Sequence, residues 1–270
     1  MNPLKQCLAG SKSRARTDLP SVSQRRKIGP SGGNLTIVAG LFSATFFFGI
    51  RPVAAFCPEP NPPRVCTEFF RANAVFVGTV TSIVEKQDAD GFTDGWVYSL
   101  QVDKDYRGAE HSPIEVFSSN DSGRFRMQKG RTYVLFPIRS DETLQIYGCG
   151  NSSEVTDAKD TLNQLGQIVK KMRTDSGGDI GGQINSGTGS GHGVGGIRVT
   201  ARGNGRTYST VTNSEGKFHI RVPAGSYTIH AKADKWAVNP EDISYESPEH
   251  VEIYNAGCAD LVFSASPHAN

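Results

Sequence analysis

The sequence predicts a mainly β protein built from two successive modules. Alternating apolar and polar residues mark five strand segments before residue 150, and a helical pattern follows them. About seven further short strand segments, without a helix, fill the remainder. The 30 Gly and 14 Pro favour many turns, and 37% hydrophobic residues in a chain of 270 suffice to pack two cores. We therefore expect a five-stranded barrel with a terminal helix, followed by a seven-stranded β-sandwich.

The first 55 residues predict an export segment. An apolar run over residues 35–50 follows a long basic region and precedes Val53-Ala54-Ala55, whose small residues suit cleavage by a signal peptidase. Because a membrane-spanning helix needs about 20 apolar residues, cleavage before Phe56 is favoured over a membrane anchor, although the sequence leaves both open. We expect a secreted or cell-envelope protein that meets a membrane only if this segment is uncleaved.

Positive charge is concentrated in the same segment. Eight of the 29 Lys and Arg residues precede residue 56, but only one of the 27 acidic residues does. Without the segment, the formal charge of +2 becomes −5, for 21 basic and 26 acidic residues. An acidic chain lacks the cationic surface that nucleic-acid binding requires, so we expect no nucleic-acid partner.

Cysteine usage agrees with export. Removing the segment removes Cys7 and leaves an even set of four cysteines, Cys57, Cys66, Cys149 and Cys258. Four cysteines in an oxidising compartment can pair in three ways, and the sequence does not choose among them. A zinc site would need closely spaced ligands such as C-x-x-C, which are missing here, so disulfides are favoured.

The elements of the first module follow a Pro-rich start. A short helix is expected over 67–72, where Thr67 is in position to cap it. Runs rich in β-branched and aromatic residues predict strands at 74–84, 96–103, 114–117, 131–136 and 144–147. Apolar residues then recur with helical spacing over 156–171, which closes a module spanning 56–173.

The second module, 179–265, follows a flexible linker at 174–178 and precedes a tail at 266–270. Its strands are expected at 179–184, 197–201, 207–212, 217–222, 227–233, 250–253 and 260–263. The segments 217–222 and 227–233 flank Pro223-Ala-Gly-Ser226, which predicts a hairpin with alternate residues on one buried face. This hairpin would place His219 opposite His230 on its outward face.

The second module resembles the carboxypeptidase regulatory-like domain over 179–264. The resemblance is carried by Ile180-Gly-Gly-Gln-Ile184, Gly196-Ile-Arg-Val199, Thr210-x-Thr212-x-x-x-Gly216-x-Phe218 and Val222-Pro-Ala-Gly-Ser-Tyr227. It implies a transthyretin-like, or prealbumin-like, sandwich that is also grouped with starch-binding folds. That fold carries no single activity, so a carbohydrate-binding role is an analogy only.

The first module looks like the netrin or tissue-inhibitor-of-metalloproteinases module over about 57–172. The matching features are Ala74-Val-Phe-Val-Gly-Thr-Val80, Asp105-Tyr-Arg-Gly108, Gly130-x-x-Tyr133-Val-Leu and a cysteine, Cys149, before a helix. The resemblance implies an OB-like barrel with a terminal helix. It also implies metalloprotease inhibition if Cys57 is the free N-terminal residue. Relatives often place a cysteine near Gly123, where this chain has Ser122-Gly-Arg, so the family's disulfide pattern cannot be transferred whole.

Candidate metal ligands occur at two places. The carboxylates of Asp88, Asp90 and Asp94 alternate around Gly91, as in a calcium loop, but the distal Glu of an EF-hand is missing, which favours an acidic turn. His219 and His230 could share a metal, but they lack a third ligand, which favours a solvated surface pair. We expect no bound metal and no cofactor.

Two aromatic residues are candidates for ligand binding. Trp236 and Tyr245 fall in a predicted loop, where either could stack on a sugar ring, although a lone Trp in a small sandwich usually belongs to the core. We find no catalytic constellation, and expect a non-catalytic binding or scaffolding protein for carbohydrate, an envelope polymer or an extracytoplasmic protein. The alternatives are a metalloprotease inhibitor and a purely structural envelope protein.

Overall fold

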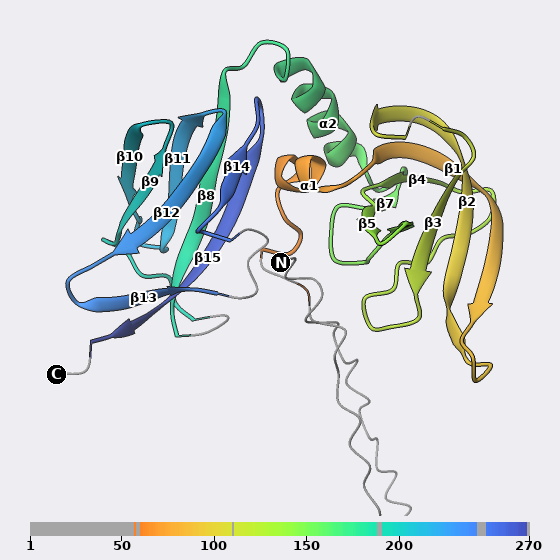
Figure 1. The fold of residues 1–270 in the computed structure, drawn as a ribbon, viewed down its shortest axis with the longest axis horizontal. Coiled ribbons are helices and arrows are strands. Elements are labelled where there is room, and N and C mark those ends of the chain that lie inside the picture. Colours follow the sequence, from red (N-terminus) through yellow and green to blue (C-terminus); the bar gives the residue numbers. More distant parts are fainter. Residues whose placement is uncertain (1–56, 58–59, 110, 188–190, 242–246, 269–270) are drawn as a thin grey trace, which may run out of the picture. The chain divides into compact units, whose positions relative to one another are not determined.

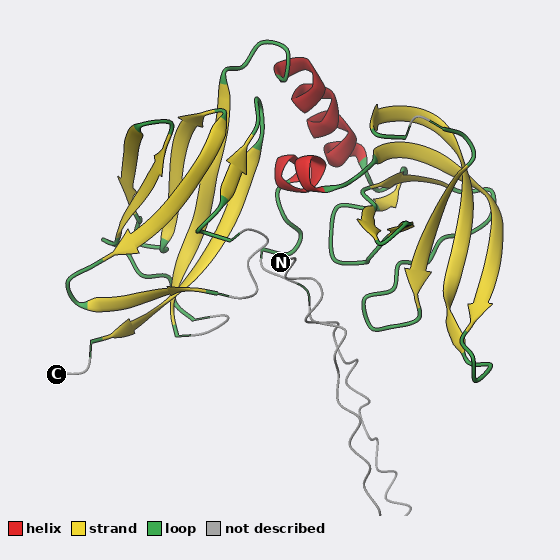
Figure 2. Ribbon diagram, in the orientation of Figure 1, coloured by secondary structure: helices red, strands yellow, loops and turns green. Residues whose placement is uncertain are grey.

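The computed structural model describes residues 57, 60–109, 111–187, 191–241 and 247–268 (Figure 1). The predicted export segment and Phe56 lie outside these residues. The described residues form fifteen strands and two helices, which confirms the mainly β prediction (Figure 2). Neither described helix combines the length and the apolar run that crossing a membrane would require.

A curled seven-stranded sheet forms the first half, with the strand order β5-β6-β3-β2-β1-β4-β7. Its strands are β1 Val75–Gln87, β2 Thr93–Arg107, β3 Ile114–Ser119, β4 Thr132–Leu135, β5 Ile138–Ser140, β6 Thr143–Gln145 and β7 Ser153–Glu154. The expected number of five strands is wrong, because β5 and β7 were missed. Segments of three and two residues are too short to show the alternation from which strands are predicted.

Strands β1 and β4 are buried on both faces. Phe76 and Leu135 point into the core of the sheet, whereas their neighbours Val75 and Val134 pack against the helices. The helices are α1 Val65–Arg71 and α2 Lys159–Lys171. Burial on both faces explains why β1 and β4 read as continuous apolar runs in the sequence.

The expectation that Thr67 caps the first helix is wrong. Helix α1 begins two residues earlier, at Val65, and its N-cap position is Arg64, which makes no side-chain capping bond. The Thr67 side chain lies inside the first turn and is buried, because its hydroxyl group is hydrogen-bonded to a distant carboxylate described below.

Two four-stranded sheets form the second half and face each other across a single core. One has the order β10-β9-β12-β14 and the other β11-β8-β15-β13. Their strands are β8 Gly177–Ser186, β9 Arg198–Gly203, β10 Arg206–Val211, β11 Lys217–Pro223, β12 Gly225–Lys232, β13 Trp236–Pro240, β14 Val251–Ile253 and β15 Cys258–Pro267. The sandwich therefore has eight strands, since β13 lies where a loop was expected.

The predicted hairpin of β11 and β12 is wrong in its pairing. Strand β11 pairs with β8, whereas β12 pairs with β9 and β14 in the opposite sheet. The predicted buried face is nevertheless correct, because Phe218, Ile220, Tyr227 and Ile229 all enter the core. Two strands that face one core from opposite sheets show the same alternation as two strands of one sheet, so the sequence pattern could not separate these arrangements.

Candidate functional site

A disulfide joins helix α1 to strand β15. Cys66 bonds Cys258 across 192 residues of sequence, with their Cα atoms 5.5 Å apart. Strand β15 runs parallel to β8, and its residues alternate between the sandwich core and the outer face of the sheet. Cys258 and Asp260 are both buried, although they belong to the outer set, because α1 packs against them. The outer face of the sandwich is thus an internal interface.

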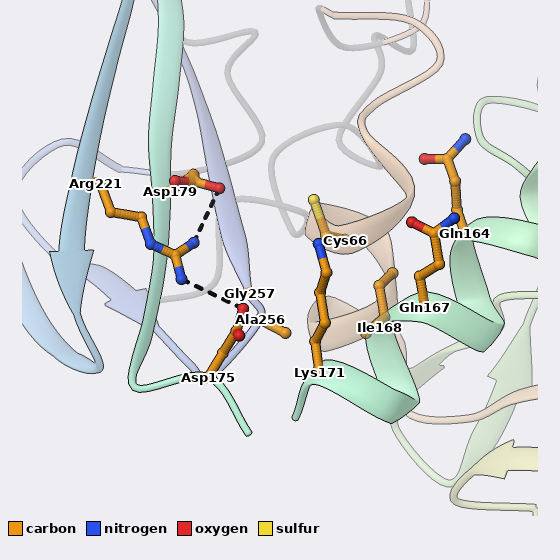
Figure 3. Close-up of a pocket in the computed structure, with 10 residues that line it drawn as sticks. All are labelled: Cys66, Gln164, Gln167, Ile168, Lys171, Asp175, Asp179, Arg221, Ala256 and Gly257. Carbon is orange, nitrogen blue, oxygen red and sulfur yellow. Dashed lines mark hydrogen bonds and ion pairs between the residues drawn. The ribbon is translucent and has the colours of Figure 1, made fainter. Parts of the chain in front are cut away.

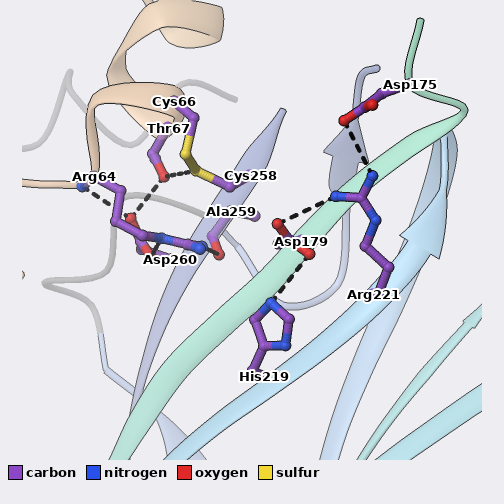
Figure 4. A network of polar contacts seen from close by, with 10 residues as sticks. All are labelled: Arg64, Cys66, Thr67, Asp175, Asp179, His219, Arg221, Cys258, Ala259 and Asp260. Atoms are coloured by element: carbon purple, nitrogen blue, oxygen red, sulfur yellow. Dashed lines mark hydrogen bonds and ion pairs between the residues drawn. A yellow bond between two sulfur atoms is a disulfide. The ribbon is translucent and has the colours of Figure 1, made fainter. Parts of the chain in front are cut away.

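Asp260 is the charged centre of this interface (Figure 4). Its side chain is only 7% exposed, and its Oδ1 accepts a hydrogen bond from Nε of Arg64 at 2.5 Å. Its Oδ2 accepts from the Thr67 hydroxyl at 2.6 Å and from the backbone N–H of Arg64 at 3.2 Å. Three donors and a cation offset the cost of burying the carboxylate.

A glycine makes room for the Arg64 guanidinium. Gly181 lies beside Asp260 in the parallel register of β8 and β15, and a Cβ atom there would come within 3.2 Å of Nη2 of Arg64. The same Nη2 donates to the carbonyl of Ala259 at 2.6 Å. The bare backbone of β8 therefore lets the guanidinium lie close to the sheet while it bonds β15.

Next to the disulfide lies a cleft of about 150 Å³ (Figure 3). Its lining comes from α1, α2, the segment between α2 and β8, the strands β8 and β11, and the turn before β15. The lining residues are Cys66, Gln164, Gln167, Ile168, Lys171, Asp175, Asp179, Arg221, Ala256 and Gly257. Most of these side chains are polar, and they converge from segments that are distant in the sequence.

Arg221 organises the charges of the cleft. Its Nη1 lies 3.3 Å from Oδ2 of Asp179, its cross-strand neighbour, and its Nη2 lies 3.3 Å from Oδ2 of Asp175. The Nε2 atom of His219 approaches Asp179 from the other side at 3.0 Å. The guanidinium is thus held in place by two carboxylates, and half of its side chain stays exposed (52%).

Glu68 is a second carboxylate with an unusual environment. Burial raises its pKa from 4.5 to about 7, against the lowering effects of the Asn151 hydrogen bonds and of the Arg71 charge. Its Oε2 accepts from the backbone N–H and from Nδ2 of Asn151, both at 2.7 Å. Because Nδ2 of Asn151 also donates to the carbonyl of Pro63 at 2.9 Å, Glu68 ties α1 to the segment that follows Cys149.

The four predicted cysteines pair as Cys57–Cys149 and Cys66–Cys258. The first bond closes 92 residues within the first half, and the second connects the two halves. Of the three pairings that the sequence left open, the structure therefore has the one in which the two closed loops overlap.

The acidic segment between β1 and β2 forms a turn. Oδ1 of Asp88 accepts the backbone N–H groups of Asp90 and Phe92 at 3.0 and 2.9 Å, and Gly91 adopts φ +82°. Among the described residues, including Asp94, no three acidic, histidine or cysteine side chains gather closely enough to hold a metal ion.

The structure separates the two candidate histidines. His219 lies on β11 and His230 on β12, which belong to different sheets, so they are not cross-strand neighbours. Trp236 lies on β13 and packs, partly buried, against the sandwich core, as a lone Trp in a small sandwich usually does. Tyr245 lies outside the described residues.

The sequence interpretation missed Arg64, Glu68, Asp260 and the cleft. One signal for Asp260 was present, because an acid within the apolar run Cys-Ala-Asp-Leu-Val-Phe263 requires a buried partner. The partner itself, about 190 residues away, leaves no local trace in the sequence.

Comparison with known proteins identifies the second half. Residues 179–251 match the carboxypeptidase regulatory-like domain. This agrees with the resemblance found in the sequence, whereas the netrin-like resemblance of the first half has no such match and stays a prediction. No curated protein matches the chain.

Two solved structures from bacilli are similar at a low level. The Bacillus anthracis TIE protein is 10% identical with a TM-score of 0.28, and covers 72% of this chain and 31% of its own. A variant of BcpA, the major pilin subunit of Bacillus cereus, is 12% identical with a TM-score of 0.25, and covers 73% of this chain and 61% of its own. The chain thus spans less than two thirds of either protein.

Proposed function

We propose that this chain is a secreted or cell-envelope protein that binds or scaffolds without catalysis, and that its two β modules act as one unit. The observation that carries the proposal is the Cys66–Cys258 disulfide, together with the buried Asp260 beside it. Two disulfides require an oxidising compartment, which supports an extracytoplasmic location. A covalent bond and a buried ion pair between modules serve to hold a fixed arrangement of surfaces.

The charged groups of the cleft support a binding role. Arg221 is held between Asp175 and Asp179, and His219 pairs with Asp179, so these groups neutralise and orient one another. Groups fixed in this way present directed donors and acceptors to a ligand. Carbohydrate or a cell-envelope polymer is the ligand class that we place first.

The test uses the protein purified after export. It is probed against soluble oligosaccharides and against insoluble cell-wall polymer, with bovine serum albumin as the inert control. Saturable binding to saccharide or polymer is expected. No binding to any saccharide or polymer would contradict the carbohydrate assignment and leave the scaffolding role to stand on the disulfide.

Metalloprotease inhibition is the second candidate, and its distinguishing feature is the position of Cys57. The Cys57–Cys149 bond anchors the start of the described chain next to the seven-stranded sheet, as a protease-gripping N-terminus requires. Mass spectrometry of the exported protein decides the matter: Cys57 as the first residue, together with inhibition of zinc proteases, would favour it. Phe56 as the first residue would rule the mechanism out and leave a purely structural envelope role as the other alternative.

A further inference from the structure

We propose that the cleft beside the Cys66–Cys258 disulfide binds one neutral sugar ring of a glycan, with the Tyr254 side chain as its stacking platform. This inference rests on the proposed carbohydrate-binding function and assigns a site to it. Tyr254 was not among the aromatic residues that the sequence pointed to.

The Tyr254 ring is exposed and yet held in a fixed orientation. The residue is 50% exposed, and its ring stacks on Phe70 of α1 with centroids 5.0 Å apart and planes 9° apart. Since Phe70 covers one face, the exposed area belongs to the other face and the edge. A pre-oriented aromatic face is what a pyranose ring packs against, because little side-chain entropy is lost on binding.

Backbone connections place this platform at the rim of the cleft. Tyr254 begins a tight turn in which its carbonyl accepts the N–H of Gly257 at 2.8 Å, and Ala256 and Gly257 of this turn line the cleft. On the other side, Phe70 follows Cys66, another lining residue, by one turn of α1. A ligand stacked on Tyr254 would therefore reach the polar groups of the cleft.

Those polar groups suit a neutral, hydroxyl-rich ligand. Lys171 and Arg221 balance Asp175 and Asp179, so the lining carries no net charge. The exposed amides of Gln164 and Gln167 lie one turn apart or less on α2, and each offers both donors and acceptors, as neighbouring hydroxyl groups do. A charged peptide or phosphate would gain little from such a lining, which is why we assign a neutral sugar.

The experiment measures affinity for three neutral probes, the tetrasaccharides of N-acetylglucosamine, of β-1,4-linked glucose and of α-1,4-linked glucose, by titration calorimetry on the exported full chain. The variants are Tyr254→Ala, Tyr254→Phe and the double change Gln164→Ala with Gln167→Ala. Phe92→Ala is the matched control, because Phe92 is also an exposed aromatic (71%) but lies in the β1–β2 turn.

For the probe that the parent binds best, Tyr254→Ala and the double glutamine variant should each weaken binding at least about tenfold, which corresponds to ~1.4 kcal/mol. Tyr254→Phe keeps the ring and should stay within about threefold of the parent, as should Phe92→Ala. If Tyr254→Ala fails to fold, the double glutamine variant decides, since both glutamines are on the surface.

The two possible failures are distinguishable. A parent that binds one probe, with the Tyr254 and glutamine variants unchanged, would overturn this site and leave carbohydrate binding intact. A parent that binds none of the three probes, nor the insoluble polymer, would overturn the carbohydrate assignment and this site together.

Discussion

Asp260 shows how one buried charge can determine an interface. The carboxylate has its donors in place, from Arg64 and Thr67, and no neighbouring element could supply them if α1 moved away. A buried ion pair adds little net stability compared with an apolar contact of the same size, but it is costly to break. The interface is therefore specific for α1 in this position.

Replacing Asp260→Asn should lower the free energy of unfolding by about 3 kcal/mol, because it leaves the Arg64 charge without its partner. Urea unfolding followed by circular dichroism measures the change. Asp234→Asn, at an exposed position, is the control and should shift stability by less than about 0.5 kcal/mol. Equal effects of the two changes would mean that the ion pair does not form.

Glu68 makes stability depend on pH. Its pKa is about 7 in the folded chain and 4.5 in the unfolded chain, so the folded state binds the proton more tightly. The resulting stability is fully present below about pH 4.5 and is lost as the pH rises through 7.

The variant Glu68→Gln should therefore lose this pH dependence. Between pH 5 and pH 8 the parent should lose up to about 3 kcal/mol that the variant keeps, since each pKa unit is worth ~1.4 kcal/mol. Unfolding in urea at both pH values is the measurement, with Glu142→Gln, an exposed carboxylate, as the control. A variant that follows the parent's pH profile would show that Glu68 titrates normally.

Strand β8 is the element on which both sides of the second half depend. It lies between β11 and β15, and its glycines admit atoms on both faces. Gly181 accommodates Arg64 on the outer face, while Gly182 lies beneath the Phe218 ring, where a Cβ atom would come within 2.7 Å of Cζ and 2.1 Å of the Leu261 carbonyl oxygen.

Gly182→Ala should consequently destabilise the protein by about 2–3 kcal/mol, because the neighbouring backbone of β15 must shift. The control is Gly166→Ala in the middle of α2, where a Cβ atom meets nothing within 4 Å. That change should stabilise by about 0.5–1 kcal/mol, since alanine favours a helix. Thermal unfolding compares the two, and a neutral Gly182→Ala would contradict the tight packing of β8.

The sequence predicted most elements of the fold but few of their partners. Alternation located β1, β2, β8 and β12 and their buried faces, because burial leaves a local periodic signal. It could not show that β11 and β12 belong to opposite sheets, nor that α1 covers β15, because partner choice leaves no periodic signal. The candidate site lies where such distant segments meet, so it was not predictable residue by residue.

At the scale of the whole molecule, disulfide connectivity is the first consequence. Digestion of the exported, unreduced protein followed by mass spectrometry should find Cys57 linked to Cys149 and Cys66 linked to Cys258, with no free thiol among the four. Reduced digestion of the same sample is the control. A Cys57–Cys66 link would mean that the two halves are not covalently joined.

The central claim is that the two halves act as one unit, and the two tryptophans allow a direct test. Trp96 lies on β2 in the seven-stranded sheet and Trp236 on β13 in the sandwich, so Trp96→Phe and Trp236→Phe each leave one fluorescent reporter per half. With both disulfides intact, the two reporters should show the same urea midpoint. In the Cys66→Ser, Cys258→Ser background both midpoints should fall, by a loss of about 3–5 kcal/mol, and should separate, whereas Cys57→Ser with Cys149→Ser should leave them coincident. Separate midpoints in the intact protein would contradict the account.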